Sequence, residues 1–261
     1  MNRHHFRHDG LTFSYLDAGG PGQPLVALHS HWLEGTTYVP LAAALAPEWR
    51  VIALDQRGHG YSDHAPTYTR EDYIGDLAAL FSHLGLNDAV LLGNSLGGVN
   101  AYQFAARYPD RVRALIIEDI GAELSEDTSF VLAWEGTFPS EEALAERVGP
   151  RFVPYLRESF RQTASGWRLA FDPHDMVVSQ RHVNGDHWGD WLATTCPALL
   201  IRGSESRVTR ASQLEQMAAR RPNTRLQVLQ GGHVVHVDNP EGFTGAVRAF
   251  LQELQGGPVP D

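Results

Sequence analysis

The sequence predicts an α/β protein with a doubly wound, mostly parallel sheet and an inserted helical cap. Short apolar runs alternate with helical patterns in residues 1–121 and again in residues 193–261. This alternation is typical of a parallel sheet with right-handed crossover connections. Between residues 122 and 192 the alternation stops and aromatic residues become dense. We expect this central stretch to be a separate unit that covers the sheet.

Strands are expected where short apolar runs end in polar residues. Two N-terminal strands, over residues 3–8 and 11–17, flank Asp9-Gly10, a dipeptide typical of a two-residue hairpin turn. The later runs are apolar throughout, as strands buried on both faces of a sheet should be. They cover residues 24–29, 50–55, 89–93, 112–119, 197–203 and 225–230.

Helices are expected between these strands. Apolar residues spaced three and four apart predict a helix over residues 70–84. Similar patterns follow at residues 96–108, 211–221 and 240–254. In such sheets the functional site lies at the carboxyl ends of the strands. The polar residues that end each apolar run are therefore the candidates for chemistry.

Residues 122–192 are interpreted as a helical cap on a core formed by residues 1–121 and 193–261. About seventy residues are too many for a loop inside a compact domain. Helical pieces are expected near residues 140–148 and 153–163. We expect the cap to lie over the strand ends.

The composition excludes several classes of protein. The formal net charge is −10 and the cations form no stripe, so no nucleic-acid partner is expected. No apolar run reaches the roughly 18 residues of a membrane span, so no membrane association is expected. Residues 1–7 lead into no apolar signal segment, and the single cysteine, Cys196, fits a reducing compartment. A cytoplasmic location is therefore expected.

No metal site and no cofactor are expected, although the chain has 13 histidines. No His-x-x-x-His pair lies on an expected helix, and one cysteine cannot build a zinc cluster. The expected partner is a small-molecule substrate. The sequence leaves open whether the chain forms a homodimer.

The strongest chemical signal is Gly93-Asn94-Ser95-Leu96-Gly97. It follows an expected strand and opens an expected helix, the setting in which Gly-x-Ser-x-Gly indicates a nucleophilic serine. The glycines leave room for a tight turn that projects the serine hydroxyl. The helix N-terminus supplies free N–H groups and positive potential. An ordinary glycine-rich turn is the alternative interpretation.

Four segments, in this order, resemble the α/β-hydrolase superfamily over nearly the whole chain. They are Leu-His-Ser-His at 28–31, Asp-Gln-Arg-Gly-His-Gly-Tyr-Ser at 55–62, Gly-Asn-Ser-Leu-Gly-Gly at 93–98, and Gly-His-Val-Val-His-Val-Asp-Asn-Pro at 232–240. The resemblance implies the α/β-hydrolase fold and a serine hydrolase with Ser95 as nucleophile. It says much less about the substrate.

The resemblance also implies the catalytic base. His233 follows the last expected strand, where the family carries its histidine. A neutral imidazole there can take the Ser95 proton and later pass it to the leaving group. His236 is the nearest competitor, and we interpret it as a packing residue or a substrate contact.

The third member of the triad departs from the usual family pattern. Most relatives place an aspartate after the strand at 197–203, where this chain has Ser206 or Arg207. Asp119 ends the strand after the nucleophile strand, where haloalkane dehalogenases and zearalenone lactonase place their acid. We favour Asp119 as the acid. Glu205 is the alternative, and a purely structural Asp119 also stays open.

The oxyanion hole is expected to use the backbone N–H groups of Leu96 and His31. Ser30 stands where the family usually has glycine, which makes the His31 donor less well defined. Trp32 is expected either to wall the acyl pocket or to belong to the core. The other expected substrate-binding side chains are Trp134, Trp167 and His236.

These residues predict hydrolysis of a small to medium apolar carboxylic ester or lactone, because the cap is aromatic and has no cluster of cations. Serine rather than aspartate at position 95 argues against epoxide hydrolase and dehalogenase chemistry. Carbon–carbon bond hydrolysis, amide cleavage and acyl transfer use the same machinery and stay open as alternatives. The alternative of another class is a ligand-binding or receptor protein on the same fold.

Overall fold

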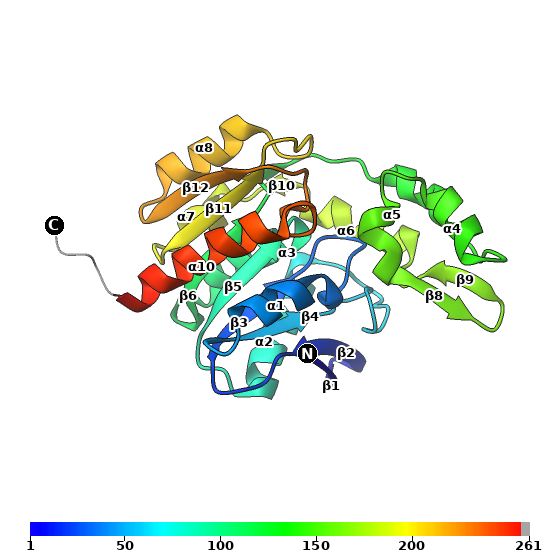
Figure 1. Ribbon diagram of the computed structural model, residues 1–261, viewed down its shortest axis with the longest axis horizontal. Coiled ribbons are helices and arrows are strands. Elements are labelled where there is room, and N and C mark those ends of the chain that lie inside the picture. Colours follow the sequence, from blue (N-terminus) through cyan, green and yellow to red (C-terminus); the bar gives the residue numbers. More distant parts are fainter. Residues whose placement is uncertain (257–261) are drawn as a thin grey trace.

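The structure of the protein, a computed structural model, describes residues 1–256 and has one large sheet at its centre (Figure 1). The eight strands lie in the order β1-β2-β4-β3-β5-β6-β11-β12. β2 pairs antiparallel with both β1 and β4, and every other pairing in this sheet is parallel. The strands are β1 (Asn2–His8), β2 (Leu11–Asp17), β3 (Gln23–Leu28), β4 (Trp49–Leu54), β5 (Ala89–Asn94), β6 (Val112–Glu118), β11 (Ala198–Gly203) and β12 (Thr224–Leu229). The predicted α/β fold with a mostly parallel sheet is confirmed.

The continuous apolar runs are explained by burial on both faces of the sheet. In β3, Leu25 and Ala27 pack into the core on one face, and Val26 and Leu28 pack into the core on the other. All four side chains are almost completely buried. Because neither face of the strand meets water, the run needs no alternation of apolar and polar residues.

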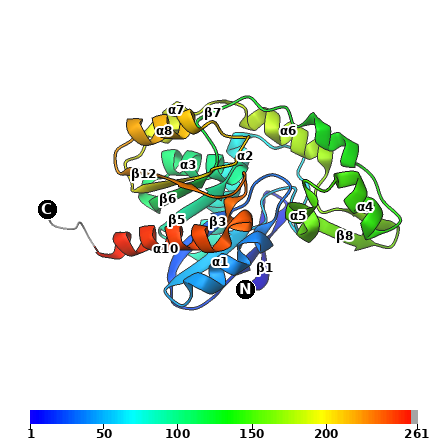
Figure 2. The same cartoon turned by 45° about the horizontal axis from the view of Figure 1, so that its top comes forward.

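Helices cover both faces (Figure 2). α1 (Val39–Leu45) and α10 (Pro240–Gly256) pack on one face, where Leu45 and Phe250 join the core around β3. α2 (Arg70–Leu84), α3 (Leu96–Arg107) and α8 (Ala211–Arg220) pack on the other. Two short pieces, η1 (Gly35–Tyr38) and η2 (Pro109–Arg111), precede α1 and β6. The four predicted core helices are present to within two residues.

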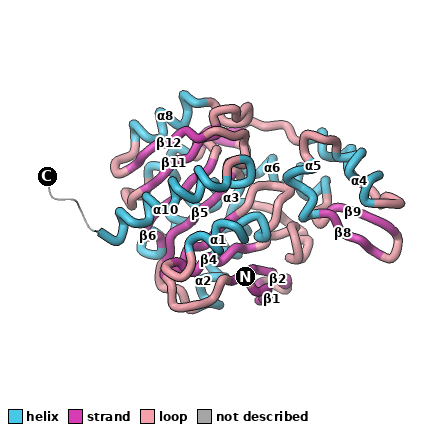
Figure 3. Tube along the Cα trace, in the orientation of Figure 1, coloured by secondary structure: helices cyan, strands magenta, loops and turns pink. Residues whose placement is uncertain are grey.

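Most of the segment 122–192 forms an arm beside the sheet, on the right of Figure 1, and its last residues return to the core. Its elements are β7 (Glu123–Leu124), η3 (Ser129–Trp134), α4 (Glu141–Val148), α5 (Val153–Leu156), η4 (Arg157–Ser159), β8 (Phe160–Thr163), β9 (Gly166–Leu169), α6 (Pro173–Val183), β10 (Gly185–Asp186) and α7 (Trp188–Leu192). The expected helix over 153–163 is wrong. The helix ends after one turn, and residues 160–163 pair antiparallel with β9 in a hairpin (Figure 3).

Two elements of this segment lie against the core. Trp191 of α7 is buried and meets Tyr102 of α3 edge to face, with ring centroids 6.1 Å apart. Its Nε1–H donates to the Met217 carbonyl of α8 at 3.0 Å. α6 returns from the arm toward the core (Figure 2). α7, which the sequence-based boundary assigns to the cap, is therefore packed on core helices.

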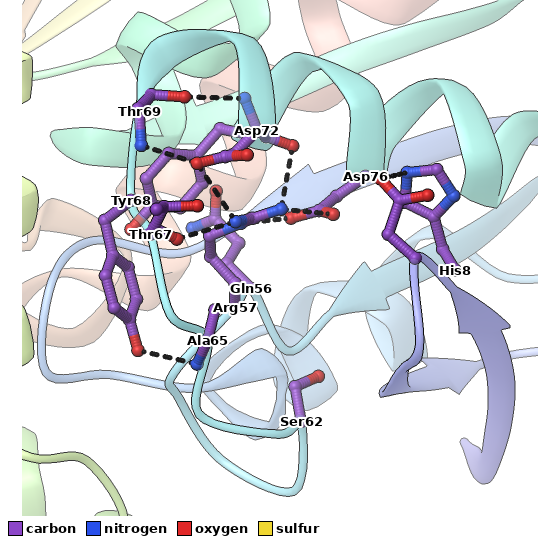
Figure 4. Close-up of polar contacts among 12 residues, drawn as sticks. His8, Gln56, Arg57, Ser62, Ala65, Thr67, Tyr68, Thr69, Asp72 and Asp76 are labelled. Carbon is purple, nitrogen blue, oxygen red and sulfur yellow. Dashed lines mark hydrogen bonds and ion pairs between the residues drawn. The ribbon is translucent and has the colours of Figure 1, made fainter.

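A buried ion pair joins the loop after β4 to α2 (Figure 4). Arg57 donates from Nε to Asp76 Oδ2 at 2.6 Å and from Nη2 to Asp76 Oδ1 at 2.8 Å. Its Nη1 also donates to the Thr67 carbonyl at 2.7 Å. α2 begins with a capping box in which Thr69 and Asp72 each accept the other's backbone N–H. The loop with the glycines at 58 and 60 is thus fixed to the start of α2.

Arg57→Ala should lower the free energy of unfolding by about 3–5 kcal/mol, because it leaves the Asp76 carboxylate buried without its partner. Burial raises the pKa of Asp76 to about 6 despite the adjacent guanidinium. A carboxyl group whose pKa is higher in the folded than in the unfolded state favours the folded state as the pH falls. The loss of unfolding free energy in Arg57→Ala should therefore be smaller at pH 5 than at pH 8. Urea unfolding of the parent and the variant at pH 5 and pH 8 measures this loss of unfolding free energy.

The matched control for this prediction is Arg7→Ala, which removes an exposed arginine of β1. Its unfolding free energy should stay within about 0.5 kcal/mol of the parent. Equal losses for both variants, or a larger deficit for Arg57→Ala at pH 5, would contradict the role assigned to the buried pair.

Candidate active site

Ser95 stands at a sharp turn between β5 and α3. Its backbone has φ 52° and ψ −117°, a conformation that non-glycine residues rarely adopt. The turn is possible because the residues two positions before and two positions after Ser95 are glycines. A Cβ on Gly93 would meet the Gly97 carbonyl oxygen at 2.2 Å, and a Cβ on Gly97 would meet the Leu28 carbonyl oxygen at 2.1 Å. The glycine spacing of the motif is therefore a steric requirement.

His233 lies in the loop between β12 and α9 (Val235–Asp238), and its side chain is 22% exposed. Its Nδ1 lies 2.7 Å from Oδ2 of Asp119. The amide of Asn94, next to the nucleophile, donates to the His233 carbonyl at 3.0 Å. Ser95 and His233 line the same cavity. The predicted nucleophile, base and favoured acid thus lie in one site.

Asp119 accepts three hydrogen bonds from residues 203–209, at the end of β11 and in the loop after it. It follows β6 with a left-handed φ of 48°, and its side chain is completely buried. The Gly203 N–H donates to Oδ1 at 3.2 Å, and the Ser206 hydroxyl donates to Oδ2. The Thr209 hydroxyl donates to the Asp119 carbonyl at 2.6 Å. Ser206, one of the two residues at the positions where most relatives carry the acid, is therefore a hydrogen-bond donor to Asp119.

Glu205 makes no contact with His233. Its backbone N–H donates to the Gly231 carbonyl at 2.9 Å, and its exposed side chain lines the cavity. Among residues 1–256 its carboxylate has no hydrogen-bond partner. Of the two candidate acids, the geometry favours Asp119.

Free backbone donors are present where an oxyanion hole was predicted. The first N–H groups of an α-helix have no partner within the helix, so the N–H of Leu96 at the start of α3 is available. Within the described part of the chain, the N–H groups of His31 and Trp32 also have no partner. Trp32 has a left-handed φ of 73°. The loop after β3 is therefore strained, as the elbow is.

His236 lies behind the site and does not line the cavity. Its Nδ1 lies 2.7 Å from Glu118 Oε2, and its Nε2 lies 2.7 Å from the Thr37 hydroxyl. Its ring stacks on Tyr38 with centroids 4.6 Å apart. The expectation of packing agrees with this position, and the expectation of substrate contact does not, because a buried carboxylate holds the ring away from the cavity.

The cavity has a volume of about 1260 Å³ and an aromatic wall. Trp32, Phe130 and Phe152 line it. Trp134, the other predicted substrate contact, does not line the cavity: it is buried and packs edge to face against Trp32 with centroids 5.6 Å apart. Trp167 does not line it. This residue lies in β9, where its backbone exchanges hydrogen bonds with Phe138. The predicted substrate contact of Trp167 is thus not supported by its position.

Charged residues at the cavity were not foreseen as a group. Arg151 and Arg207 line it, and neither has a hydrogen-bond or ion-pair partner among the described residues. The acidic side chains that line it are Glu126, Asp127, Glu205 and Asp238. The expectation of no cation cluster concerned residues 122–192 alone; of the two arginines here, Arg151 comes from that segment and Arg207 from the loop after β11. The charges escaped notice because they come from separate loops and form no run in the sequence.

Within residues 1–256, no group of three or more His, Cys, Asp or Glu side chains is arranged to hold a metal ion. No helix in the described range has the length and apolar character needed to cross a membrane.

Comparison with known proteins supports the fold. The chain is 29% identical over 253 residues to a 2-(acetamidomethylene)succinate hydrolase of Mesorhizobium japonicum, with 89% of each chain covered. It is 24% identical over 211 residues to 3-oxoadipate enol-lactonase 2 of Acinetobacter baylyi, covering 78% of this chain and 79% of that one.

The similarity extends to the three-dimensional structure. The crystal structure of an E-2-(acetamidomethylene)succinate hydrolase superposes with a TM-score of 0.86 at 25% identity, covering 97% of this chain and 99% of that one. A sequence model of the Alpha/beta hydrolase family matches residues 20–246, which is most of the chain. The protein therefore belongs to the α/β hydrolase family.

Proposed function

We propose that the protein is a serine hydrolase that cleaves a small to medium carboxylic ester or lactone through an acyl-enzyme. The observation that carries the proposal is the 2.7 Å contact between His233 Nδ1 and Asp119 Oδ2 at a cavity that Ser95 also lines. A completely buried carboxylate on one ring nitrogen leaves the other nitrogen to face the nucleophile.

In the first half of the reaction, the Ser95 hydroxyl attacks the acyl carbonyl carbon. His233 takes the hydroxyl proton on Nε2, and Asp119 stabilises the imidazolium through Nδ1. The carbonyl oxygen becomes an oxyanion, which the N–H groups of Leu96 and His31 bind. When the tetrahedral intermediate collapses, His233 returns the proton to the departing alkoxide, and the acyl group stays on Ser95.

In the second half, water attacks the acyl-enzyme. His233 removes a proton from the water, the same two N–H groups bind the second oxyanion, and the proton returns to Ser95 as the acid is released. Every proton in this cycle moves through one imidazole. The steps need only water and groups of the chain itself.

The substrate class is supported by the aromatic wall. The rings of Trp32, Phe130 and Phe152 offer an apolar surface beside the nucleophile. The two relatives described above are named for hydrolysis of 2-(acetamidomethylene)succinate and of an enol-lactone. Both named substrates are acyl compounds, an amide and a lactone, so the relatives support acyl hydrolysis, and the apolar preference rests on the aromatic wall.

Ser95→Ala should lower kcat on a short-chain nitrophenyl ester by about 10⁴–10⁶, because the group that forms the covalent intermediate is lost. His233→Ala should lose a similar amount, since nucleophile and base act as a unit. Steady-state kinetics measures both, with circular dichroism as the check on folding.

Ser82→Ala, which removes an exposed hydroxyl of α2, is the matched control and should retain parental kcat. Full turnover by Ser95→Ala would contradict the mechanism. Binding of ester without turnover by the parent protein would favour the receptor alternative.

Asp119→Asn should lower kcat by about 10²–10⁴, because an amide cannot stabilise the imidazolium and favours the wrong tautomer. Glu205→Gln should change kcat by less than about tenfold, since this exposed carboxylate makes no contact with His233. Steady-state kinetics on one ester compares kcat of the two variants, after their melting temperatures have been shown to match that of the parent. An inactive Glu205→Gln variant together with an active Asp119→Asn variant would mean that the triad acid is Glu205, in the loop after β11.

Phe130→Ala should alter the preference among acyl chain lengths more than the activity on the smallest ester. The side chain lines the cavity and is 47% exposed, so its loss removes wall surface with little effect on the core. Trp167→Ala, at the hairpin away from the cavity, should leave the preference unchanged. Specificity constants over a series of esters measure this, and a uniform fall for Phe130→Ala would argue against a substrate-contact role.

A further inference from the structure

We propose that Ser159 and Ser179 of the cap are positioning residues for the oxyanion hole. Their hydroxyl groups hold the loop of residues 30–34, which we name the oxyanion loop. The inference rests on the proposed function, because it assigns the second oxyanion donor to this loop. It adds that the cap shapes the catalytic machinery as well as the substrate cavity.

The oxyanion loop needs outside support because its backbone is strained. Trp32 has a left-handed φ of 73°, which a bulky side chain rarely adopts. Such a conformation persists only where the surroundings hold it. The N–H groups of His31 and Trp32, which both precede the strained N–Cα bond of Trp32 in the chain, have no hydrogen-bond partner among the described residues. A relaxed Trp32 would turn these donors away from the Ser95 side of the cavity.

The core holds the two ends of this loop: the Gly35 N–H, just after the loop, donates to Asp55 Oδ1 at 2.8 Å, and a second set of contacts holds the start. His29 Nδ1 donates to the Ser30 carbonyl at 2.7 Å, and the Gln56 N–H donates to His29 Nε2 at 3.0 Å. The Gln56 side chain also donates to the His29 carbonyl at 2.6 Å. Burial lowers the pKa of His29 to about 4, so its ring is neutral and can make both contacts. This set of core contacts ends at Ser30.

The cap holds the rest of the loop through three polar contacts. Ser179 Oγ in α6 lies 2.8 Å from His31 Nε2. The Ser159 hydroxyl in η4 donates to the Trp32 carbonyl at 2.8 Å. Arg161 in β8 forms an ion pair with Glu34. Each contact reaches a different residue of the oxyanion loop, so together they fix both sides of the strained Trp32.

These contacts are shielded from water. Ser159, Ser179 and His31 are at least 94% buried, and Glu34 is 98% buried. Hydrogen bonds in such surroundings are stronger than those exposed to solvent. Ser179 is itself held by the Tyr73 hydroxyl of α2 at 2.7 Å. A continuous chain of contacts thus joins α2 of the core, α6 of the cap and the oxyanion loop.

This arrangement separates two roles that the cap could have. A cap that only forms the wall of the cavity would affect KM and substrate preference. A cap that holds an oxyanion donor affects binding of the transition state, and therefore kcat. The two roles predict different kinetic changes for the same substitution.

The test uses Ser159→Ala and Ser179→Ala with a short-chain nitrophenyl ester and a trifluoromethyl ketone of similar size. The ketone forms a reversible tetrahedral adduct with the nucleophile and so reports oxyanion binding. Both variants should lose about 10- to 100-fold in kcat, because a displaced donor weakens transition-state binding. The ketone affinity should fall in proportion, and KM should stay within about twofold of the parent.

Three controls separate positioning from packing. Ser165→Ala removes an exposed hydroxyl of the β8–β9 turn that contacts only Thr163 among the described residues, and should leave kcat, KM and ketone affinity unchanged. Ser159→Thr keeps a hydroxyl and should recover most of kcat. His31→Ala keeps its backbone N–H but removes the ring, so Ser179→Ala should cost little more when added to it.

The proposal is overturned if both serine variants keep parental kcat and ketone affinity, whether KM rises or the melting temperature falls. If Ser179→Ala does not fold, Ser159→Ala in its separate element gives the same test. These outcomes are distinct from failure of the proposed function, which shows as full turnover by Ser95→Ala. Dependence on Ser95 together with parental kcat in both variants would reject the positioning role alone.

Discussion

The buried carboxylate of Asp119 is the interaction on which the site depends. It lies at the end of β6 and receives hydrogen bonds from the Gly203 N–H of β11 and from Ser206. Through the 2.7 Å contact with His233 it fixes the imidazole in the loop after β12. These segments are far apart in the sequence, and the parallel sheet brings their carboxyl ends together at one edge. A buried charge is stable only when donors surround it. The hydrogen bonds that stabilise the Asp119 carboxylate therefore also fix the orientation of the His233 ring.

Much of the fold and the centre of the site could be predicted because local chemistry determines them. Strands such as β3 are buried on both faces, and this produces apolar runs that can be recognised without any contact information. The elbow at Ser95 demands glycine at positions 93 and 97 for steric reasons that leave a motif. Asp119 could be proposed as the acid because Ser206 and Arg207 cannot replace a carboxylate, which directed attention to the neighbouring strand end.

The remaining features depend on long-range contacts that leave no pattern in one sequence. Phe160–Thr163 becomes a strand only because β9 pairs with it. His236, in α9, is directed away from the cavity by Glu118 at the end of β6. Arg151, from a loop within residues 122–192, and Arg207, from the loop after β11, both line the cavity. Ser159 and Ser179 resemble ordinary polar residues in the sequence, and only the fold shows that they contact the loop after β3.

The most direct test of the triad needs no knowledge of the natural substrate. A fluorophosphonate reacts with an activated serine, so its rate of labelling, with the adduct located by peptide mass spectrometry, reports the nucleophile and its support together. The triad predicts one adduct, on Ser95, with a labelling rate that falls by about 10² or more in Asp119→Asn and stays at the parental value in Glu205→Gln. An adduct on another serine, or an unchanged rate in Asp119→Asn, would contradict it.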